Sequence, residues 1–332
     1  MKKLLIFLLL STSLVFFSAC SSKRVFEPNN VDDDWENYGA IEERIIDVTS
    51  SVAMLENRKV ISKYENLNIT IDEGYRILST SDGWIISAKT DGNLKLQQID
   101  ASNIVEEFEL KKTIASASVD DDTLAVLFAD NEMALYSIAT KELLLKEQGG
   151  STIAVDARIV SPYFLNTVVI FATLDGKVVI VSRETNEKLR ASIVSSADAF
   201  NNIIYFDIID RKIIAATASQ ILSMSQQEVR EKYEIRNVAY DGISIFLTTK
   251  QGELVSLTSD LQFNGKLKFP FAHFLGIIIH NDTVYALEKE GYLIVAPTDL
   301  SSYKIYEADI EEGFVFVGEK KFYINDEYIS VE

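Results

Sequence analysis

One unit of this chain reads Val168-Val-Ile-Phe-Ala-Thr-Leu-Asp-Gly-Lys-Val-Val-Ile-Val-Ser-Arg-Glu-Thr-Asn-Glu-Lys-Leu-Arg190. Its two apolar runs are rich in Val, Ile and Phe, which suit pleated, half-buried strands. Between them lies Asp175-Gly176, a dipeptide that supplies the positive φ of a tight hairpin turn. The stretch therefore predicts a β-hairpin that leads, through a polar turn, to another strand.

Similar units recur along most of the chain. Their turns lie at residues 91, 130, 175, 219, 251, 290 and 319, with spacings of 39, 45, 44, 32, 39 and 29 residues. A period near forty is typical of propeller blades, in which stacked four-stranded sheets bury both of their faces around an axis. A two-sheet sandwich is the alternative, and the regular period favours the propeller.

These units predict an all-β fold, a β-propeller of seven to eight four-stranded blades over residues 44–332. The seven turns, together with the apolar segment 45–61, set the number of blades. The last unit stops soon after its second strand, at Val331-Glu332. We therefore expect strands from the N-terminal region to complete it and to close the ring. Aromatic side chains are expected to line the packing between blades: Tyr205, Phe206, Phe269 and Phe271.

Composition excludes several classes of protein. The 332 residues include one cysteine and two histidines, which are too few for a disulfide scaffold or a Cys/His zinc site. The formal net charge is −18, from 32 basic and 50 acidic side chains. A surface this acidic repels phosphate, so we expect no nucleic-acid partner.

The first residues have the pattern of a secretory signal. Met1-Lys2-Lys3 precedes an apolar run up to Phe17, and Ser18-Ala19-Cys20 follows. This end resembles a bacterial lipobox, which implies a signal peptide over 1–19, cleavage before Cys20 and lipidation of its thiol; the alternative is that Cys20 is an ordinary residue of the apolar run. Residues 20–43 are expected to be a flexible tether. Ser21 after the cysteine favours, by the same resemblance, an outer-membrane anchor with the domain facing the periplasm.

The repeat resembles the quinoprotein-type propeller unit. The best match runs from Leu174-Asp175-Gly176-Lys177 through Arg183-Glu184-Thr185-Asn186, although Arg190 stands where that family places a tryptophan. A lipid anchor and a propeller together are similar to the BamB-like lipoproteins of the outer-membrane β-barrel assembly machinery. The resemblance implies a non-catalytic scaffold that binds the barrel-forming subunit.

In that family the partner surface lies on loops between adjacent blades. The matching positions here are Arg158 and Asp198, with Val155 and Ala157 as apolar flanks. By resemblance these four residues contact the barrel-forming subunit; otherwise Arg158 is a surface arginine and Asp198 a turn residue. An exposed edge strand could also pair with unfolded outer-membrane proteins by β-augmentation.

The sequence offers little material for catalysis, and we predict no enzyme, cofactor or metal site. Propellers of the quinoprotein type can hold a quinone, but stacking needs tryptophans, and this chain has only Trp35 and Trp84. His273 and His280 flank an apolar run and are interpreted as strand-end residues. The remaining alternatives are a ligand-binding or quinone-dependent propeller and an adhesion or interaction protein of the envelope.

Overall fold

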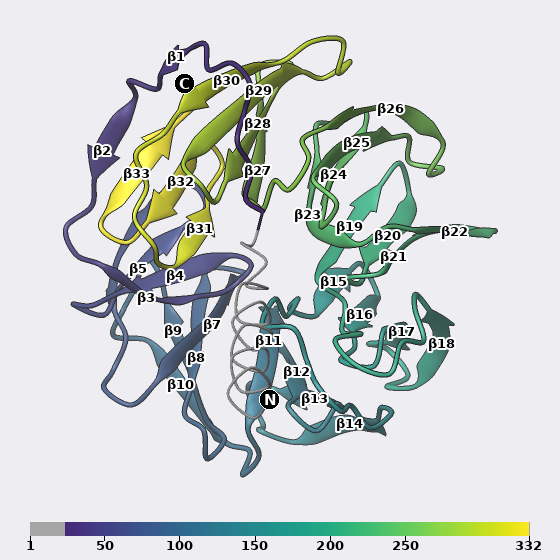
Figure 1. Ribbon diagram of the computed structural model, residues 1–332. Helices are drawn as coiled ribbons and strands as arrows, with labels where there is room; N and C mark the ends of the chain where they lie inside the picture. Colours follow the sequence, from purple (N-terminus) through teal and green to yellow (C-terminus); the bar gives the residue numbers. More distant parts are fainter. Residues whose placement is uncertain (1–23, 332) are drawn as a thin grey trace, which may run out of the picture.

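The computed structural model describes residues 24–331, and every helix or strand assigned in that range is a β-strand. The strands form eight sheets around a central axis, and Figure 1 shows these sheets arranged in a ring. Seven sheets have four strands and one has five. The predicted all-β propeller is therefore confirmed, with eight blades.

Six blades consist of four strands that follow one another in the sequence, and each begins with its inner strand. Blades 1 to 3 contain β3 (Ile45–Val48), β4 (Val52–Leu55), β5 (Lys59–Ser62), β6 (Asn66–Thr70); β7 (Arg76–Ser81), β8 (Trp84–Ala88), β9 (Asn93–Gln98), β10 (Val105–Glu109); β11 (Ile114–Asp120), β12 (Thr123–Phe128), β13 (Glu132–Ser137) and β14 (Leu143–Gln148). Blades 4 to 6 contain β15 (Tyr163–Leu165), β16 (Val168–Ala172), β17 (Lys177–Ser182), β18 (Lys188–Ile193); β19 (Tyr205–Ile209), β20 (Lys212–Ala216), β21 (Gln220–Met224), β22 (Glu228–Lys232); β23 (Ile235–Tyr240), β24 (Ile245–Thr249), β25 (Glu253–Leu257) and β26 (Phe263–Lys268).

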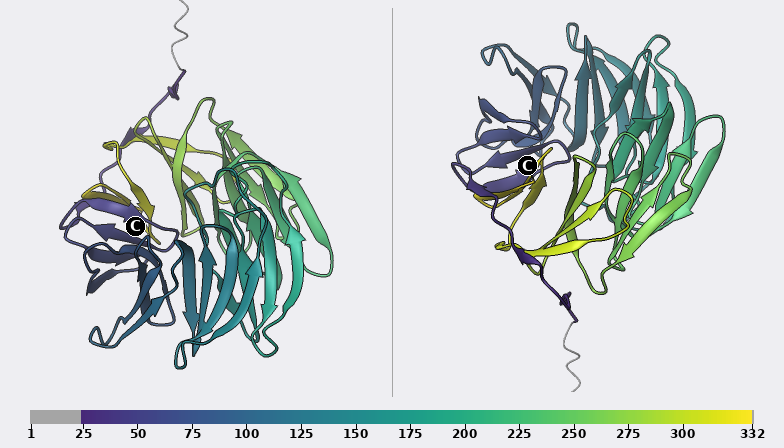
Figure 2. Two further views of the ribbon diagram at one scale, coloured as in Figure 1. Left: turned by 90° about the horizontal axis from the view of Figure 1, so that it is seen from below. Right: turned by 90° about the horizontal axis from the view of Figure 1, so that it is seen from above.

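The N-terminal segment completes the last two blades. Blade 7 contains β27 (Phe274–His280), β28 (Thr283–Glu288), β29 (Tyr292–Pro297) and β30 (Lys304–Glu307), with β1 (Asp33–Asp34) added parallel to β30. Blade 8 contains β31 (Val315–Val317), β32 (Lys321–Ile324) and β33 (Glu327–Ser330), with β2 (Tyr38–Ala40) added antiparallel to β33. The two views of Figure 2 show this purple segment beside the yellow C-terminal strands. The predicted ring closure by both ends of the chain is confirmed.

In the part of residues 20–43 that the structure describes, the segment packs on the propeller from Phe26 onward, so the expected flexible tether does not hold there. Phe26 is buried against Phe269 and Tyr292, and the backbone N–H of Asp32 donates to the carbonyl oxygen of Ile305 at 2.7 Å. The segment includes three consecutive acidic residues, Asp32, Asp33 and Asp34. Strand pairing uses backbone groups, so acidic side chains can point to solvent while the backbone extends a sheet.

The repeat turns at residues 91, 130, 175, 219, 251 and 290 lie in the middle hairpins of their blades, whereas the turn at residue 319 lies between β31 and β32, the first two strands of blade 8. Gly176 connects β16 to β17 with φ of 79°, and a Cβ there would come within 2.7 Å of the Ser195 carbonyl oxygen. Both the backbone angle and the space therefore require glycine. In blade 3 the equivalent turn uses Asn131, at φ of 66°, because asparagine tolerates the left-handed region better than most residues.

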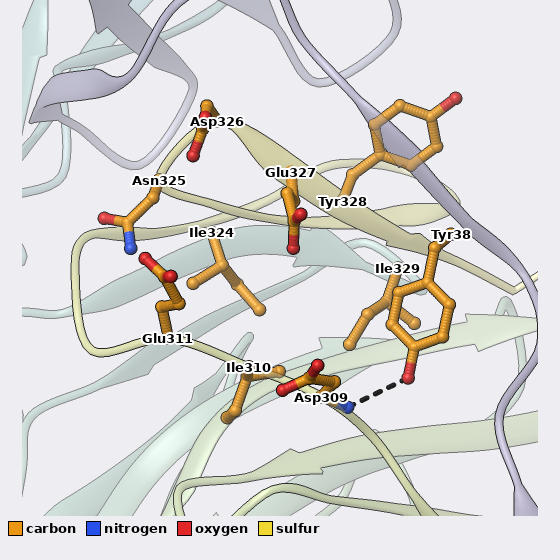
Figure 3. Close-up of a pocket in the computed structure, with 10 residues that line it drawn as sticks. All are labelled: Tyr38, Asp309, Ile310, Glu311, Ile324, Asn325, Asp326, Glu327, Tyr328 and Ile329. Atoms are coloured by element: carbon orange, nitrogen blue, oxygen red, sulfur yellow. Dashed lines mark hydrogen bonds between the residues drawn. The ribbon is translucent and has the colours of Figure 1, made fainter.

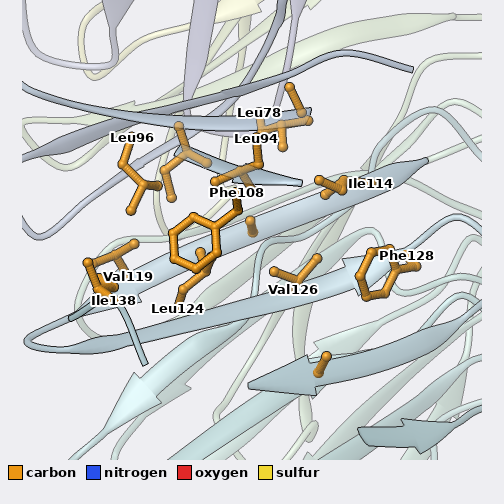
Figure 4. Packing of buried hydrophobic residues seen from close by; sticks show 14 residues of the cluster. Leu78, Leu94, Leu96, Phe108, Ile114, Val119, Leu124, Val126, Phe128 and Ile138 are labelled. Carbon is orange, nitrogen blue, oxygen red and sulfur yellow. The ribbon is translucent and has the colours of Figure 1, made fainter. Parts of the chain in front are cut away.

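The hydrophobic core lies between successive blades. In the cluster of Figure 4, Leu94 and Leu96 of blade 2 pack with Val126 and Phe128 of blade 3. Full burial of a Leu or Phe side chain stabilises the fold by about 1.5 to 3 kcal/mol. Of the aromatics expected between blades, Tyr205 and Phe206 are half-buried and Phe269 is buried, but Phe271 is 53% exposed. The prediction for Phe271 was wrong because this residue stands in the turn before β27, at φ of 70°, and not in a strand between blades.

Within residues 24–331, the structure has no helix that is long and apolar enough to cross a membrane.

Candidate functional site

Two long connections between blades lie side by side on one face of the ring. Residues 149–162 lead from β14 to β15, and residues 194–204 lead from β18 to β19. Asn202, which is fully buried, holds them together: its Nδ2 donates to the carbonyl oxygens of Asp156 (3.2 Å) and Arg158 (3.0 Å). Its Oδ1 accepts the Asp156 N–H at 2.7 Å, and the Phe200 N–H donates to Ala154 at 2.9 Å. The loops predicted to bind a partner therefore form one surface.

The side chain of Arg158 is turned toward its own loop. Its Nε and Nη2 donate to the two carboxylate oxygens of Asp156 at 2.9 and 2.5 Å, and Nη1 donates to the carbonyl oxygen of Arg236. Burial opposes ionisation of Asp156, but the hydrogen bonds from Arg158 outweigh it and hold the pKa of that carboxyl below its usual value. Arg158 therefore orders the loop, and its side chain remains 40% exposed.

The other predicted site residues are distributed over the same surface. Asp198 and Ala157 are exposed, whereas Val155 is half-buried against the core between blades 3 and 4. Cys20 lies outside the described residues. The structure thus brings the loops of Arg158 and Asp198 together and leaves Asp198 open to solvent.

Three exposed apolar side chains on connections between blades were not predicted as site residues. Ile153 is 82% exposed and Phe200 57% exposed, on the two adjoining loops. Phe271 lies on the connection from β26 to β27. Phe200 and Phe271 have φ of 52° and 70°, a conformation that bulky side chains rarely adopt. The sequence signal is an isolated phenylalanine in a polar loop, Ser195-Ser196-Ala197-Asp198-Ala199-Phe200-Asn201-Asn202.

A chain of contacts connects these loops across the face. The Arg158 guanidinium reaches the backbone of Arg236, and Arg236 Nη1 lies 2.8 Å from Nε2 of His273. His273 is two residues after Phe271. We call this surface the loop face and define it by Ile153, Arg158, Phe200, Arg236, Phe271 and His273.

The two histidines lie at strand ends, as predicted. His273 immediately precedes β27, and His280 is the last residue of that strand. In the described part of the chain, no group of three or more His, Cys, Asp or Glu side chains is placed to hold a metal ion.

A pocket with a volume of about 180 Å³ lies beside the closing strand β2 (Figure 3). The hydroxyl oxygen of Tyr38 accepts the Asp309 N–H there at 2.9 Å. Burial raises the pKa of Tyr38, so this phenol stays neutral. None of the ten lining residues is basic, and four are acidic: Asp309, Glu311, Asp326 and Glu327. The pocket is lined by Tyr38 of β2 and by residues of β32 and β33, so it lies where the N-terminal strand closes the ring.

Solved structures confirm the architecture. BamB from Moraxella catarrhalis superposes with a TM-score of 0.68 over 89% of this chain and 99% of its own, at 11% identity. Sqt1 from Saccharomyces cerevisiae superposes with a TM-score of 0.61 over 89% of this chain and 98% of its own, at 9% identity. The fold is therefore BamB-like, and at these identities the likeness concerns the fold alone.

The relatives by sequence are different proteins from these structural neighbours. The plasminogen-binding protein PgbB of Helicobacter pylori strain J99 is 29% identical over 93% of this chain, and its counterpart in strain 26695 is 28% identical. The chain spans 66% of the length of these relatives. The family model described as the RSE1/DDB1/CPSF1 second beta-propeller matches residues 88–289. Because this match covers more than half of the sequence, the chain belongs to the RSE1/DDB1/CPSF1 second β-propeller family.

Proposed function

We propose that this chain is a non-catalytic scaffold of the cell envelope that binds a protein partner through the loop face. One observation carries the proposal: Ile153, Phe200 and Phe271 expose apolar side chains on loops of the same face, and two of them have left-handed backbones. Exposed aromatic and aliphatic anchors are typical of partner-binding surfaces. Strained backbone is retained where the surroundings impose it, often at binding sites.

The anchor would hold the loop face near a membrane. The guanidinium of Arg24 lies over the Phe271 ring, 5.5 Å from its centroid. A lipidated Cys20 is four residues away, and four extended residues span at most about 14 Å. In this proposal residues 1–19 are removed, Cys20 carries the lipid, and the propeller faces the periplasm from the outer membrane.

Plasminogen is the first candidate partner. The supporting observation is the similarity to PgbB over 93% of this chain. In this case the chain is instead an envelope interaction protein that faces outward, and its lipid anchor would display the loop face to an extracellular ligand.

The barrel-forming subunit of outer-membrane assembly is the second candidate. The structure joins the loops of Arg158 and Asp198 through Asn202, and the anchor favours a partner held in the same membrane. Unfolded outer-membrane proteins would then be the clients of the complex.

Binding assays on the full chain, purified in detergent, separate the two candidates. Immobilised chain is exposed to plasminogen or to the periplasmic part of the barrel-forming subunit. We expect one partner to bind and the double substitution Ile153→Ser, Phe200→Ser to reduce its affinity at least tenfold. The matched control is Ile243→Ser, because Ile243 is 78% exposed at the other end of β23. Binding that survives the double substitution, or that Ile243→Ser weakens equally, would refute the loop face as the site.

A further inference from the structure

Arg236 has unused hydrogen-bonding capacity in the middle of the loop face. Its contact with His273 is the one side-chain hydrogen bond that its guanidinium makes to the described residues, and its Nε is buried without an acceptor. Among the ion pairs of the described chain, none includes Arg236. A guanidinium has five N–H donors, and the contacts within the protein use few of those of Arg236.

Among residues 24–331, the surroundings of Arg236 add the positive charge of Arg158, and no carboxylate pairs with Arg236. Burial, and then the charge of Arg158, lower the pKa of Arg236 from its usual value, which shows that the guanidinium is held in an unfavourable place. Arg158 itself is paired with Asp156. A half-buried charge without a counter-ion destabilises a fold, and an anionic ligand would relieve that cost.

The neighbouring backbone holds His273 in position. The His273 N–H donates to Oε1 of Glu288 at 2.7 Å, and Glu288 is fully buried at the end of β28. Because the backbone at His273 is fixed, its ring and Arg236 meet in a defined geometry. Phe271, two residues earlier in the chain, has an exposed side chain.

We propose that Arg236, placed by its contact with His273, receives a carboxylate of the bound partner, with an adjacent apolar side chain of the partner packing on Phe271. Arginine binds carboxylates through two parallel hydrogen bonds, a geometry that lysine cannot reproduce. The apolar side chains around the site match a peptide better than they match a free phosphate. This inference rests on the proposed function, because it specifies what the loop face recognises.

Matched peptides test the inference on the full chain in detergent by titration calorimetry. The probes are acetyl-Gly-Ser-Phe-Asp-Gly-Ser-amide and the same peptide with Asn for Asp. A third probe, acetyl-Gly-Ser-Phe with a free carboxyl end, distinguishes a terminal carboxylate from a side-chain carboxylate. We expect a carboxylate probe to bind at least tenfold more tightly than the Asn peptide, and Arg236→Gln to abolish that difference.

Control variants separate charge from geometry. Arg236→Lys should retain only part of the preference, whereas Arg190→Gln should retain all of it, because Arg190 is paired with Glu228 on the outer strands. If Arg236→Gln fails to fold, the peptide comparison on the unaltered chain still tests the carboxylate preference. Equal binding of the Asp and Asn peptides and the free-carboxyl probe, or tighter binding of inorganic phosphate than of any carboxylate probe, would overturn the inference. If a candidate partner binds but no carboxylate preference is found, this inference is refuted and the proposed function stands. If the carboxylate preference is found but neither candidate partner binds, the proposed partners are wrong and this inference stands.

Discussion

The indole Nε1 of Trp35 donates a hydrogen bond of 3.1 Å to the carbonyl oxygen of Ser330, which lies 295 positions later in the sequence. The indole also packs against Tyr285 and Tyr306, with ring centroids 6.1 and 5.2 Å apart. Trp35 stands between β1 and β2. One side chain of the N-terminal segment therefore contacts both blade 7 and blade 8.

We expect Trp35→Ala to lower the free energy of unfolding by about 2 to 3 kcal/mol, because it removes a half-buried aromatic side chain and a hydrogen bond at the ring closure. Denaturant unfolding measures the change. Tyr64→Ala is the control, since Tyr64 is 77% exposed and should change stability little. Equal stability of the Trp35 variant and the unaltered chain would show that closure does not depend on this contact.

Asn131 joins blade 3 to blade 4. Its buried amide donates to the carbonyl oxygen of Gly150 at 2.8 Å and to Asp175 Oδ1 at 2.9 Å, and its Oδ1 accepts the Leu174 N–H at 2.9 Å. Asn131→Ala should lower the free energy of unfolding by about 2 to 4 kcal/mol, because buried polar groups lose their partners.

Asn131→Gly separates the two contributions at this position. Glycine relieves the backbone at φ of 66° but restores no hydrogen bond, so most of the loss should remain. Thermal unfolding of both variants checks this expectation. A glycine variant as stable as the unaltered chain would mean that backbone angle, and not hydrogen bonding, explains the choice of asparagine.

The repeat could be predicted because it depends on local chemistry. Asp175-Gly176 between two β-branched runs specifies a hairpin through φ and strand propensity alone, and the truncated last unit indicates that other strands complete it. The pairing of Asp33 with Tyr306 could not be predicted, because it uses backbone groups that any sequence possesses.

The loop face was predicted only in part for a similar reason. Arg158 and Asp198 could be assigned to loops between blades, but the adjacency of these loops depends on buried Asn202, which reads as one more polar loop residue. Phe271 is exposed in a turn with a left-handed backbone. Such features arise from tertiary packing, and no periodic pattern encodes them.

Acid should weaken the contact between the outer strands of blades 4 and 5. Hydrogen bonds from Ser192, Arg230 and Arg190 lower the pKa of Glu228 from 4.5 to about 2. Because the folded state binds the proton less readily, the stabilisation is present above about pH 4.5 and is lost as the pH falls toward 2. Glu228→Gln should lower the melting temperature at pH 7, and the difference from the unaltered chain should shrink between pH 4.5 and 2.

Glu184→Gln is the control for this pH series, because Glu184 is exposed and forms none of the salt bridges found in residues 24–331. Its melting temperature should follow that of the unaltered chain at every pH. A constant difference between Glu228→Gln and the unaltered chain from pH 7 to 2 would contradict the assignment.

Phe200 offers a test of whether backbone strain is retained for binding. A bulky residue in the left-handed region costs about 1 to 2 kcal/mol, and asparagine tolerates that region. Phe200→Asn should therefore raise the free energy of unfolding by up to about 1 kcal/mol while it weakens partner binding at least tenfold. Ile243→Asn is the matched control, because Ile243 has no left-handed φ and lies away from the loop face. This variant should not gain stability, and its affinity for the partner should stay unchanged. Denaturant unfolding and the partner-binding assay together decide, because a Phe200→Asn variant that binds normally would show that the strained phenylalanine serves no partner.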